Sequence, residues 1–323
     1  MKPTAREFYW FKLSRLSNLT SSAKGVLYKH LAATGEEIDS IFSYSKAAFE
    51  AAFPEFGKPP FDTIKYGMLD SISRTELIET FRTLNPEIQL LCLDDRRYPT
   101  HLRNRLGAAA PPVLFVRGLP QLFNRRTVFV LGAEEIDEHE KRVLWKIVWH
   151  ITRAGYHITS THNWGSADEI HRAALNTEGT TGGFVGGGIQ DFSFKKNIRV
   201  FDWQRNTLFA SPFHPLARST ANFRAKQLLL SLLDADAVIV VPGRNMDDQS
   251  SNFKHLEEVV GRVKRWEIPL FVPSRTLLPY AAPYPHWLME VTQTFDHPKA
   301  IVQSLPDPFS PIARSDRLGF RLT

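Results

Sequence analysis

The alternation of short apolar runs with amphipathic segments between residues 87 and 275 constrains the fold more than any other feature of this chain. Runs typical of buried strands lie at 88–93, 113–116, 128–131, 157–160, 181–185, 207–210, 237–241 and 268–272. Segments with helical spacing follow several of them, at 138–154, 167–177, 219–233 and 253–265. This order predicts an α/β fold with a doubly wound, mostly parallel sheet.

The segments on either side of this region have a different character. Residues 1–86 predict short helices: one runs from the cap Thr20-Ser21-Ser22 toward Gly35, one covers 45–53, and one begins after Ser73. Residues 276–323 are rich in proline, with a short helix expected around Trp287 and a basic tail. We therefore expect a helical domain (1–86), an α/β domain (87–275) and a C-terminal extension (276–323).

Composition limits the classes of protein to which the chain can belong. Its 323 residues carry a formal charge of +6, and the isoelectric point is about 9.4, which is compatible with nucleic acid as a partner. The single cysteine, Cys92, excludes an internal disulfide and a multi-cysteine zinc site. No signal-peptide pattern and no apolar run long enough for a bilayer is seen. We expect a cytoplasmic protein that uses no membrane, metal or other cofactor.

Small residues follow the predicted strands at the edge where ligands of parallel sheets bind. They form the turns at 131–133, 160–162, 186–188, 210–212 and 241–243. Glycines in such turns let backbone N–H groups approach an anion, although a glycine can also serve only to make a tight turn. The repetition favours a phosphate-bearing ligand at this edge.

Charged residues near these turns add to the same prediction. Arg224 and Lys226 lie near the start of the predicted helix 219–233, just after Arg218, where cations are unfavourable unless an anion compensates them. Solvated surface arginines are the alternative explanation. Asp168 and His171 share a helix face, either as an acid–base pair or as a structural contact. The predicted phosphate or nucleic-acid contacts are Gly132, Ser160, Gly165, Ser166, Gly186, Gly188, Lys195, Lys196, Ser211, Arg218, Arg224 and Lys226.

The segment from Tyr98 to Gly118 resembles the start of the core of the DprA/Smf family. A Tyr-Pro pair is followed by a Pro-Pro pair, an apolar run and Arg117-Gly118. Further along, Ser160, Gly165 and His171 match the family segment Ser-Gly-x-Ala-x-Gly-Ile-Asp-x-x-x-His. The family's Leu-Gly-x-Gly-Leu turn resembles 185–189, and its Asp-Ala-x-x-Val-Val strand matches 236–241.

The resemblance implies a Rossmann-like core, single-stranded DNA as partner, a RecA-type recombinase as a further partner, a homodimer and no catalytic role. The chain departs from the family pattern at three places. Gly132-Ala133-Glu134 stands where the family has Gly-Thr-Arg, Leu228 replaces the second arginine of Arg-Asn-Arg, and the later Ser-Gly-rich stretch is lost within 247–256. Replacement of an anion-facing arginine by an acid weakens phosphate binding.

Three other functions stay open at this stage. The glycine turns together with the altered arginines also fit a sensor of a nucleotide or nucleotide signal. An enzyme that hydrolyses nucleotides would use Glu257, after the turn Val241-Pro242-Gly243. A scaffold that acts through a partner surface is the last alternative. Our main prediction, which follows the family resemblance, is a non-catalytic protein that binds single-stranded DNA in DNA processing or recombination.

Overall fold

The computed structural model describes residues 4–15, 19, 21–54, 62, 74–133, 135–162, 166–190, 192, 204–243, 257, 260–261, 266–279, 284 and 286–312. The helices are α1 (Ala5–Arg15), α2 (Ser21–Thr34), α3 (Ser40–Ser43), α4 (Lys46–Ala52), α6 (Arg74–Thr83), α7 (Thr100–Leu106), α8 (Glu138–Arg153), α9 (Ala167–Asn176), α10 (Ala221–Leu233), α12 (His286–Met289) and α13 (Pro298–Ser304), with 3-10 turns η1 (Gly107–Ala109) and η2 (Pro120–Asn124). The strands are β1 (Ile88–Cys92), β2 (Val113–Gly118), β3 (Thr127–Gly132), β4 (His157–Thr159), β5 (Thr181–Phe184), β6 (Thr207–Ser211), β7 (Ala237–Val241), β8 (Leu270–Pro273) and β9 (Gln293–Phe295).

The described strands form one sheet in the order β1-β2-β6-β5-β4-β3-β7-β8-β9. From β6 to β9 every neighbouring pair is parallel, whereas β2 is antiparallel to both β1 and β6. The predicted α/β class with a mostly parallel sheet is confirmed. The chain runs from β3 outward to β6 and then returns to the other side of β3 as β7, so the sheet is doubly wound.

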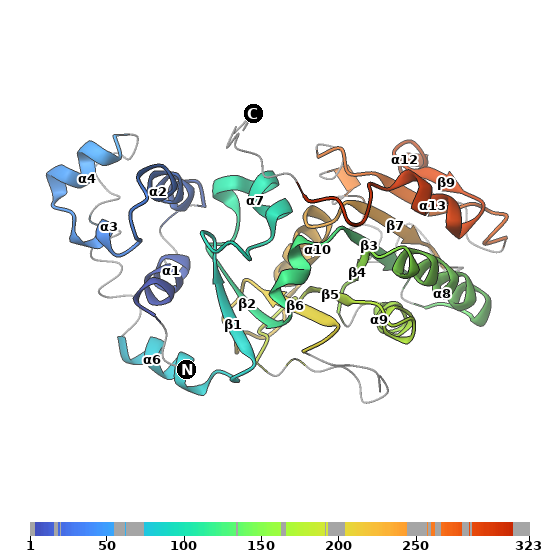
Figure 1. The fold of residues 1–323 in the computed structure, drawn as a ribbon, viewed down its shortest axis with the longest axis horizontal. Helices are drawn as coiled ribbons and strands as arrows, with labels where there is room; N and C mark the ends of the chain where they lie inside the picture. Colours follow the sequence, from blue (N-terminus) through green and yellow to red (C-terminus); the bar gives the residue numbers. More distant parts are fainter. Residues whose placement is uncertain are drawn as a thin grey trace.

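The two faces of the sheet bury different helices (Figure 1). Along β3, Val128 and Val130 pack with α8, α9 and α13, whereas the alternate residues Phe129 and Leu131 pack on the opposite side. This alternation follows from the period of two in a strand. Both faces are covered, which is why β7 and residues 128–131 of β3 are apolar at every position.

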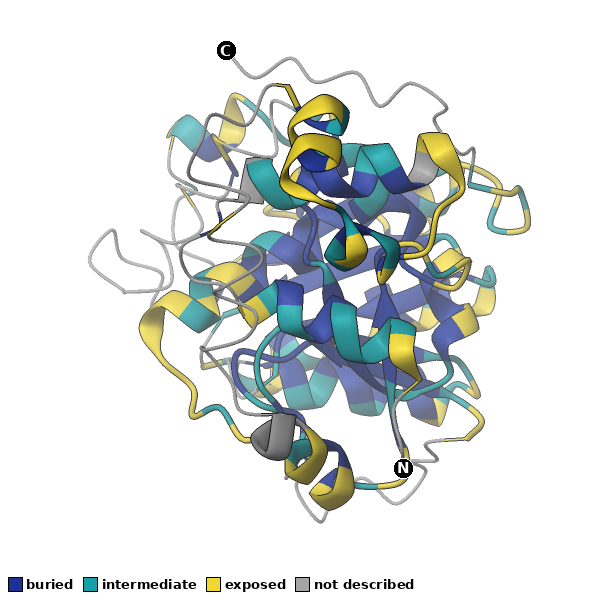
Figure 2. Ribbon diagram, turned by 90° about the vertical axis from the view of Figure 1, so that its left-hand side faces the viewer, coloured by how far each residue is buried: buried dark blue, intermediate teal, exposed yellow. Residues whose placement is uncertain are grey.

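The N-terminal helices share the core of the second face. The ring of Phe11 from α1 meets Phe81 of α6 and Phe115 of β2 edge-on, at centroid distances of 5.6 and 5.4 Å. The same apolar cluster includes Leu27 of α2 and the buried side of α10, represented by Leu228. Figure 2 shows buried residues on the inner sides of the helices and exposed residues outside. The division into three domains remains a proposal.

The C-terminal segment adds elements that the sequence pattern did not predict. β9 extends the sheet beside β8, and α13 packs on α8. Beyond α13 the chain crosses the amino-terminal edge of the sheet, where the Tyr156 hydroxyl donates to the Pro306 carbonyl at 2.5 Å and the Arg126 guanidinium donates to Ser310. The helix expected near Trp287 is α12. Most of the predicted helix 253–265 and the basic tail after 312 lie outside the described residues.

Candidate nucleic-acid interface

A groove opens at the carboxyl-terminal edge of the sheet, between the ends of β5 and β6 and the start of α10. Its volume is about 550 Å³. The groove lies where ligands of parallel sheets bind, as the positions of the small-residue turns predicted. Its lining residues are His162, Val185, Gly186, Gly187, Gly188, Phe192, Pro215, Leu216, Ala217, Arg218, Ser219, Arg224 and Gln227.

The glycine turn after β5 is packed against the loop after β6. A Cβ atom on Gly188 would stand 2.0 Å from the Pro215 carbonyl oxygen, so only glycine fits there without a backbone shift. The Gly188 N–H donates to the Ala217 carbonyl at 2.7 Å. The Ser211 hydroxyl donates to the Gly187 carbonyl at 2.5 Å and accepts from the Phe213 N–H at 3.1 Å. Ser211 is fully buried, so it positions the turn and does not face a ligand.

Two backbone donors of the turn have no acceptor among the described residues. Within the described part of the chain, the N–H groups of Gly186 and Gly187 donate no hydrogen bond to protein. Both residues line the groove. Successive N–H groups of this kind at a turn attract an anion, which is compatible with the contact predicted for Gly186.

Arg218 and Arg224 bring positive charge to the groove. Both are exposed, and among the described residues no carboxylate lies within 4 Å of either guanidinium. Arg224 belongs to the first turn of α10, which is capped by the Thr220 hydroxyl accepting from the Phe223 N–H at 3.2 Å. The structure thus brings Gly186, Gly188, Arg218 and Arg224 together in one groove.

Gln227 is a groove residue that sequence reasoning missed. It is only 2% exposed, and its Nε2 has no hydrogen-bond partner among the described residues. A buried N–H group without an acceptor is unfavourable, which favours a ligand oxygen at this position. The spacing of three from Arg224 on one helix face could have revealed it.

The other predicted contacts lie in different places. The Ser160 hydroxyl is buried and donates to the Val130 carbonyl at 2.8 Å, which joins β4 to β3. Gly132 packs closely on Ser166: a Cβ atom added to Gly132 would stand 1.8 Å from the Ser166 Oγ. This Oγ is buried and has no hydrogen-bond partner among the described residues. Lys226 does not line the groove. Gly165, Lys195 and Lys196 lie outside the described residues.

The part of the chain that contains the groove matches a known protein family. The family model of DNA recombination-mediator protein A matches residues 89–247, which include all the groove residues. Residues 89–247 belong to the DprA/Smf family. No curated protein matches the sequence.

Two solved DprA structures have a similar fold. The DNA processing protein A (DprA) of Streptococcus pneumoniae is 16% identical, with a TM-score of 0.69 over 95% of this chain and 99% of the other. The Helicobacter pylori DprA, described for its single-stranded DNA binding mode, is 15% identical, with a TM-score of 0.52 over 68% of this chain and 95% of the other. These likenesses establish a shared fold with DprA.

The departures from the DprA pattern have different structural settings. Leu228, in place of the family's second arginine, is fully buried in the core beneath α10. A charged guanidinium there would lose its hydration, so the leucine belongs to the packing of this protein. Glu134 lies outside the described residues.

The predicted Asp168–His171 pair does not form part of the groove. His171 is fully buried, with Nε2 at 3.1 Å from the Thr161 carbonyl and Nδ1 at 2.8 Å from the Thr181 hydroxyl. Burial lowers the pKa of His171 to about 4, so the ring is neutral near pH 7. Of the two explanations, the geometry fits a structural role that ties α9 to β5.

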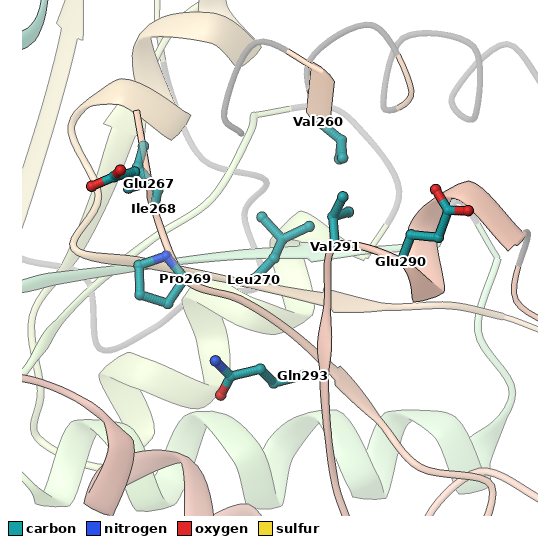
Figure 3. A pocket seen from close by; sticks show the side chains of 8 residues that line it. All are labelled: Val260, Glu267, Ile268, Pro269, Leu270, Glu290, Val291 and Gln293. Atoms are coloured by element: carbon teal, nitrogen blue, oxygen red, sulfur yellow. The ribbon is translucent and has the colours of Figure 1, made fainter. Parts of the chain in front are cut away.

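A second hollow lies at the opposite edge of the sheet, around the start of β8 and β9. Its volume is about 260 Å³, and Figure 3 shows the carboxylates of Glu267 and Glu290 at its sides. Two acids without a lining cation disfavour a phosphate ligand. Among the described residues, no group of three or more metal-ligating side chains is present, and no helix is long and apolar enough to cross a membrane.

Proposed function

We propose that this DprA relative binds single-stranded DNA in the groove, without catalysis, as a step in DNA processing or recombination. The observation that carries the proposal is the convergence of unpaired donors. The groove is lined by Arg218, Arg224, the buried Gln227 amide and the N–H groups of Gly186 and Gly187, which have no acceptor among the described residues. All of these donors suit phosphate oxygens, and none of them is a nucleophile or general base.

The salt dependence of binding tests this proposal. Anisotropy of labelled oligo-dT should show binding at about 50 mM salt that weakens toward about 200 mM. The double variant Arg218→Gln/Arg224→Gln should lower the slope of log K against log salt by about 1.4, or about 0.7 per lost phosphate contact. Gln227→Leu should weaken binding about tenfold or more with little change in slope, because its amide is uncharged.

Matched controls remove the same charge from other exposed positions. Arg96→Gln combined with Lys46→Gln removes two exposed cations away from the groove. This control should leave the salt slope close to that of the unmodified protein. The absence of binding at low salt, or equal slopes for the two double variants, would contradict the proposal.

A nucleotide ligand is the second candidate. The groove volume of about 550 Å³ lies within the usual range for small-molecule sites, about 300–1,000 Å³. A thermal-shift panel of nucleotides distinguishes the two: a raised melting temperature with one nucleotide, without oligonucleotide binding, would favour the sensor. Glu257 does not line the groove, so nothing in its position favours a hydrolase.

The family resemblance extends the proposal to partners and location. We infer a homodimer that acts in the cytoplasm and delivers single strands to a RecA-type recombinase. Sedimentation of the protein alone, and then with a recombinase and oligo-dT, tests both associations. A monomer at micromolar concentration would contradict the first, and independent sedimentation of the two proteins would contradict the second.

A further inference from the structure

The basic residues Arg224 and Lys226 lie on two different faces of α10. Arg224 and Gln227, three residues apart, line the groove, whereas Phe223 and Lys226, also three apart, lie on a different face. The Phe223 ring stacks on Phe213 with a centroid distance of 3.8 Å and an interplanar angle of 11°. The Lys226 ammonium lies 5.9 Å from the centre of the Phe213 ring. A second basic and aromatic surface therefore lies beside the groove.

The N-terminal helices contact the loop that carries Phe213. The Thr80 hydroxyl of α6 lies 3.3 Å from Nε2 of His214, and the Phe11 ring of α1 lies 6.3 Å from the His214 ring. Phe213 and His214 are adjacent in the chain. The helices thus contact the loop whose residues 215–219 line the groove.

Lys24 of α2 adds a second positive charge at this junction. Its ammonium donates to the Ser14 carbonyl at 3.2 Å. Burial, followed by the charge of Lys226, lowers the pKa of Lys24. Partial burial also lowers the pKa of Lys226, because it removes water from the ammonium group. The residue as a whole is still exposed. Among the described residues, no carboxylate lies within 4 Å of either ammonium.

Two partly desolvated like charges repel, and a bound anion would relieve the repulsion. Both rings of the Phe213–Phe223 pair are half-buried, so part of the pair remains accessible. Bases stack on aromatic rings while phosphates bind nearby lysines, without dependence on sequence. A single strand supplies both groups at successive positions, which a free phosphate or an acidic peptide does not.

We propose that Lys24, Lys226 and the Phe213–Phe223 pair form a second contact for single-stranded DNA, which continues the strand from the groove onto the N-terminal helices. This inference rests on the proposed function of the groove. It assigns α2 a direct part in binding, with a phosphate between the two lysines and a base against the aromatic pair. A strand that occupies only the groove does not reach this contact, whereas a longer strand does.

The length of the oligonucleotide separates the two contacts. Oligo-dT of about 4 and about 16 nucleotides spans the range of known single-strand site sizes. Lys24→Gln should lower the salt slope for the longer strand by about 0.7 and leave the shorter strand unchanged. Lys24→Arg should restore the slope because it keeps the charge. The matched control is Lys46→Gln, which removes an exposed cation from α4 of the same helical unit.

The outcomes distinguish this inference from the function on which it rests. Binding of the longer strand with equal slopes for Lys24→Gln and Lys46→Gln overturns the second contact and leaves the groove proposal standing. A slope that falls for both strand lengths also overturns it, because Lys24 would then act on the groove itself. Failure of the unmodified protein to bind either strand at low salt overturns both proposals. A loss confined to the longer strand supports the second contact.

Discussion

At the scale of the residue, His171 is held between two oxygens beneath the carboxyl-terminal edge of the sheet. The Thr161 carbonyl can only accept, so Nε2 carries the proton. Nδ1 of the neutral ring lies 2.8 Å from the Thr181 hydroxyl, whose single proton also faces the Ile158 carbonyl at 3.0 Å. Burial leaves no room for water to stabilise a second proton. The histidine therefore contributes to folding in a way that depends on pH.

Replacement of His171 by asparagine should flatten the acid side of the stability profile. Below the usual pKa of about 6.5 the unfolded chain binds a proton that the folded ring, with a pKa of about 4, does not. The free energy of unfolding should therefore fall as pH drops from about 6.5 to 4, by up to about 1.4 kcal/mol per pH unit from this residue. Urea denaturation across that range should show a slope smaller by this amount in His171→Asn.

The exposed His286 provides the control for this measurement. His286→Asn should change the slope little, because that side chain is largely in solvent and its contact with Glu290, at 3.1 Å, is solvent-exposed. Buried Asp234 works in the opposite direction, since burial raises its pKa, but it is present in every variant and cancels in the comparison. Equal slopes for both histidine variants would show that folding does not change the pKa of His171.

At the scale of the element, α10 fixes the positions of the groove side chains. Its first turn begins at Thr220, whose hydroxyl accepts from the Phe223 N–H and whose carbonyl accepts from the Arg224 N–H at 3.0 Å. The sequence predicted this helix and its basic start. It did not predict on which face of the helix each cation lies. That depends on the close approach of Gly186 to Arg224 and Gln227, which are far from it in the sequence.

Loss of the cap should loosen this turn. Thr220→Ala is expected to lower the free energy of unfolding by about 0.5–2 kcal/mol, because the Phe223 N–H loses its acceptor. It should also weaken oligo-dT binding through Arg224. Thr220→Ser keeps the oxygen and serves as the control, with both quantities near those of the unmodified protein. Equal stability of the two variants in urea denaturation would mean that solvent caps the helix equally well.

At the scale of the whole molecule, the helical N-terminus and the sheet are joined through one apolar cluster. Local patterns predicted most strands and the helices at 21–34, 46–52 and 74–83. They did not predict α1, β9 or α13, whose stability comes from distant partners such as Phe115, β8 and α8. Of the site, the glycine turn and the two arginines were predictable. Gln227 and the second face of α10 were not, because burial is a tertiary property.

Phe11 should therefore stabilise both parts at once. Phe11→Ala is expected to cost about 3–5 kcal/mol, as for a buried aromatic ring, and to reduce hydrogen-exchange protection in β2 as well as in α1. Phe8→Ala on the same helix removes a half-buried ring and should cost less. Unchanged protection of β2 in Phe11→Ala would show that the helices unfold independently of the sheet.

The apolar cluster shared by the N-terminal helices and the sheet also affects the entropy and the rate of ligand binding. Lys24 on α2 and Arg224 on α10 are attached to elements that pack into the same apolar cluster. Their relative positions are fixed in the free protein. The loss of conformational entropy on binding would therefore come mainly from the DNA strand and only slightly from the protein. Fixed positive charges also attract a polyanion at long range. For the proposed complex we therefore expect association limited by encounter, and a lifetime that depends on how many of the fixed charges the strand covers.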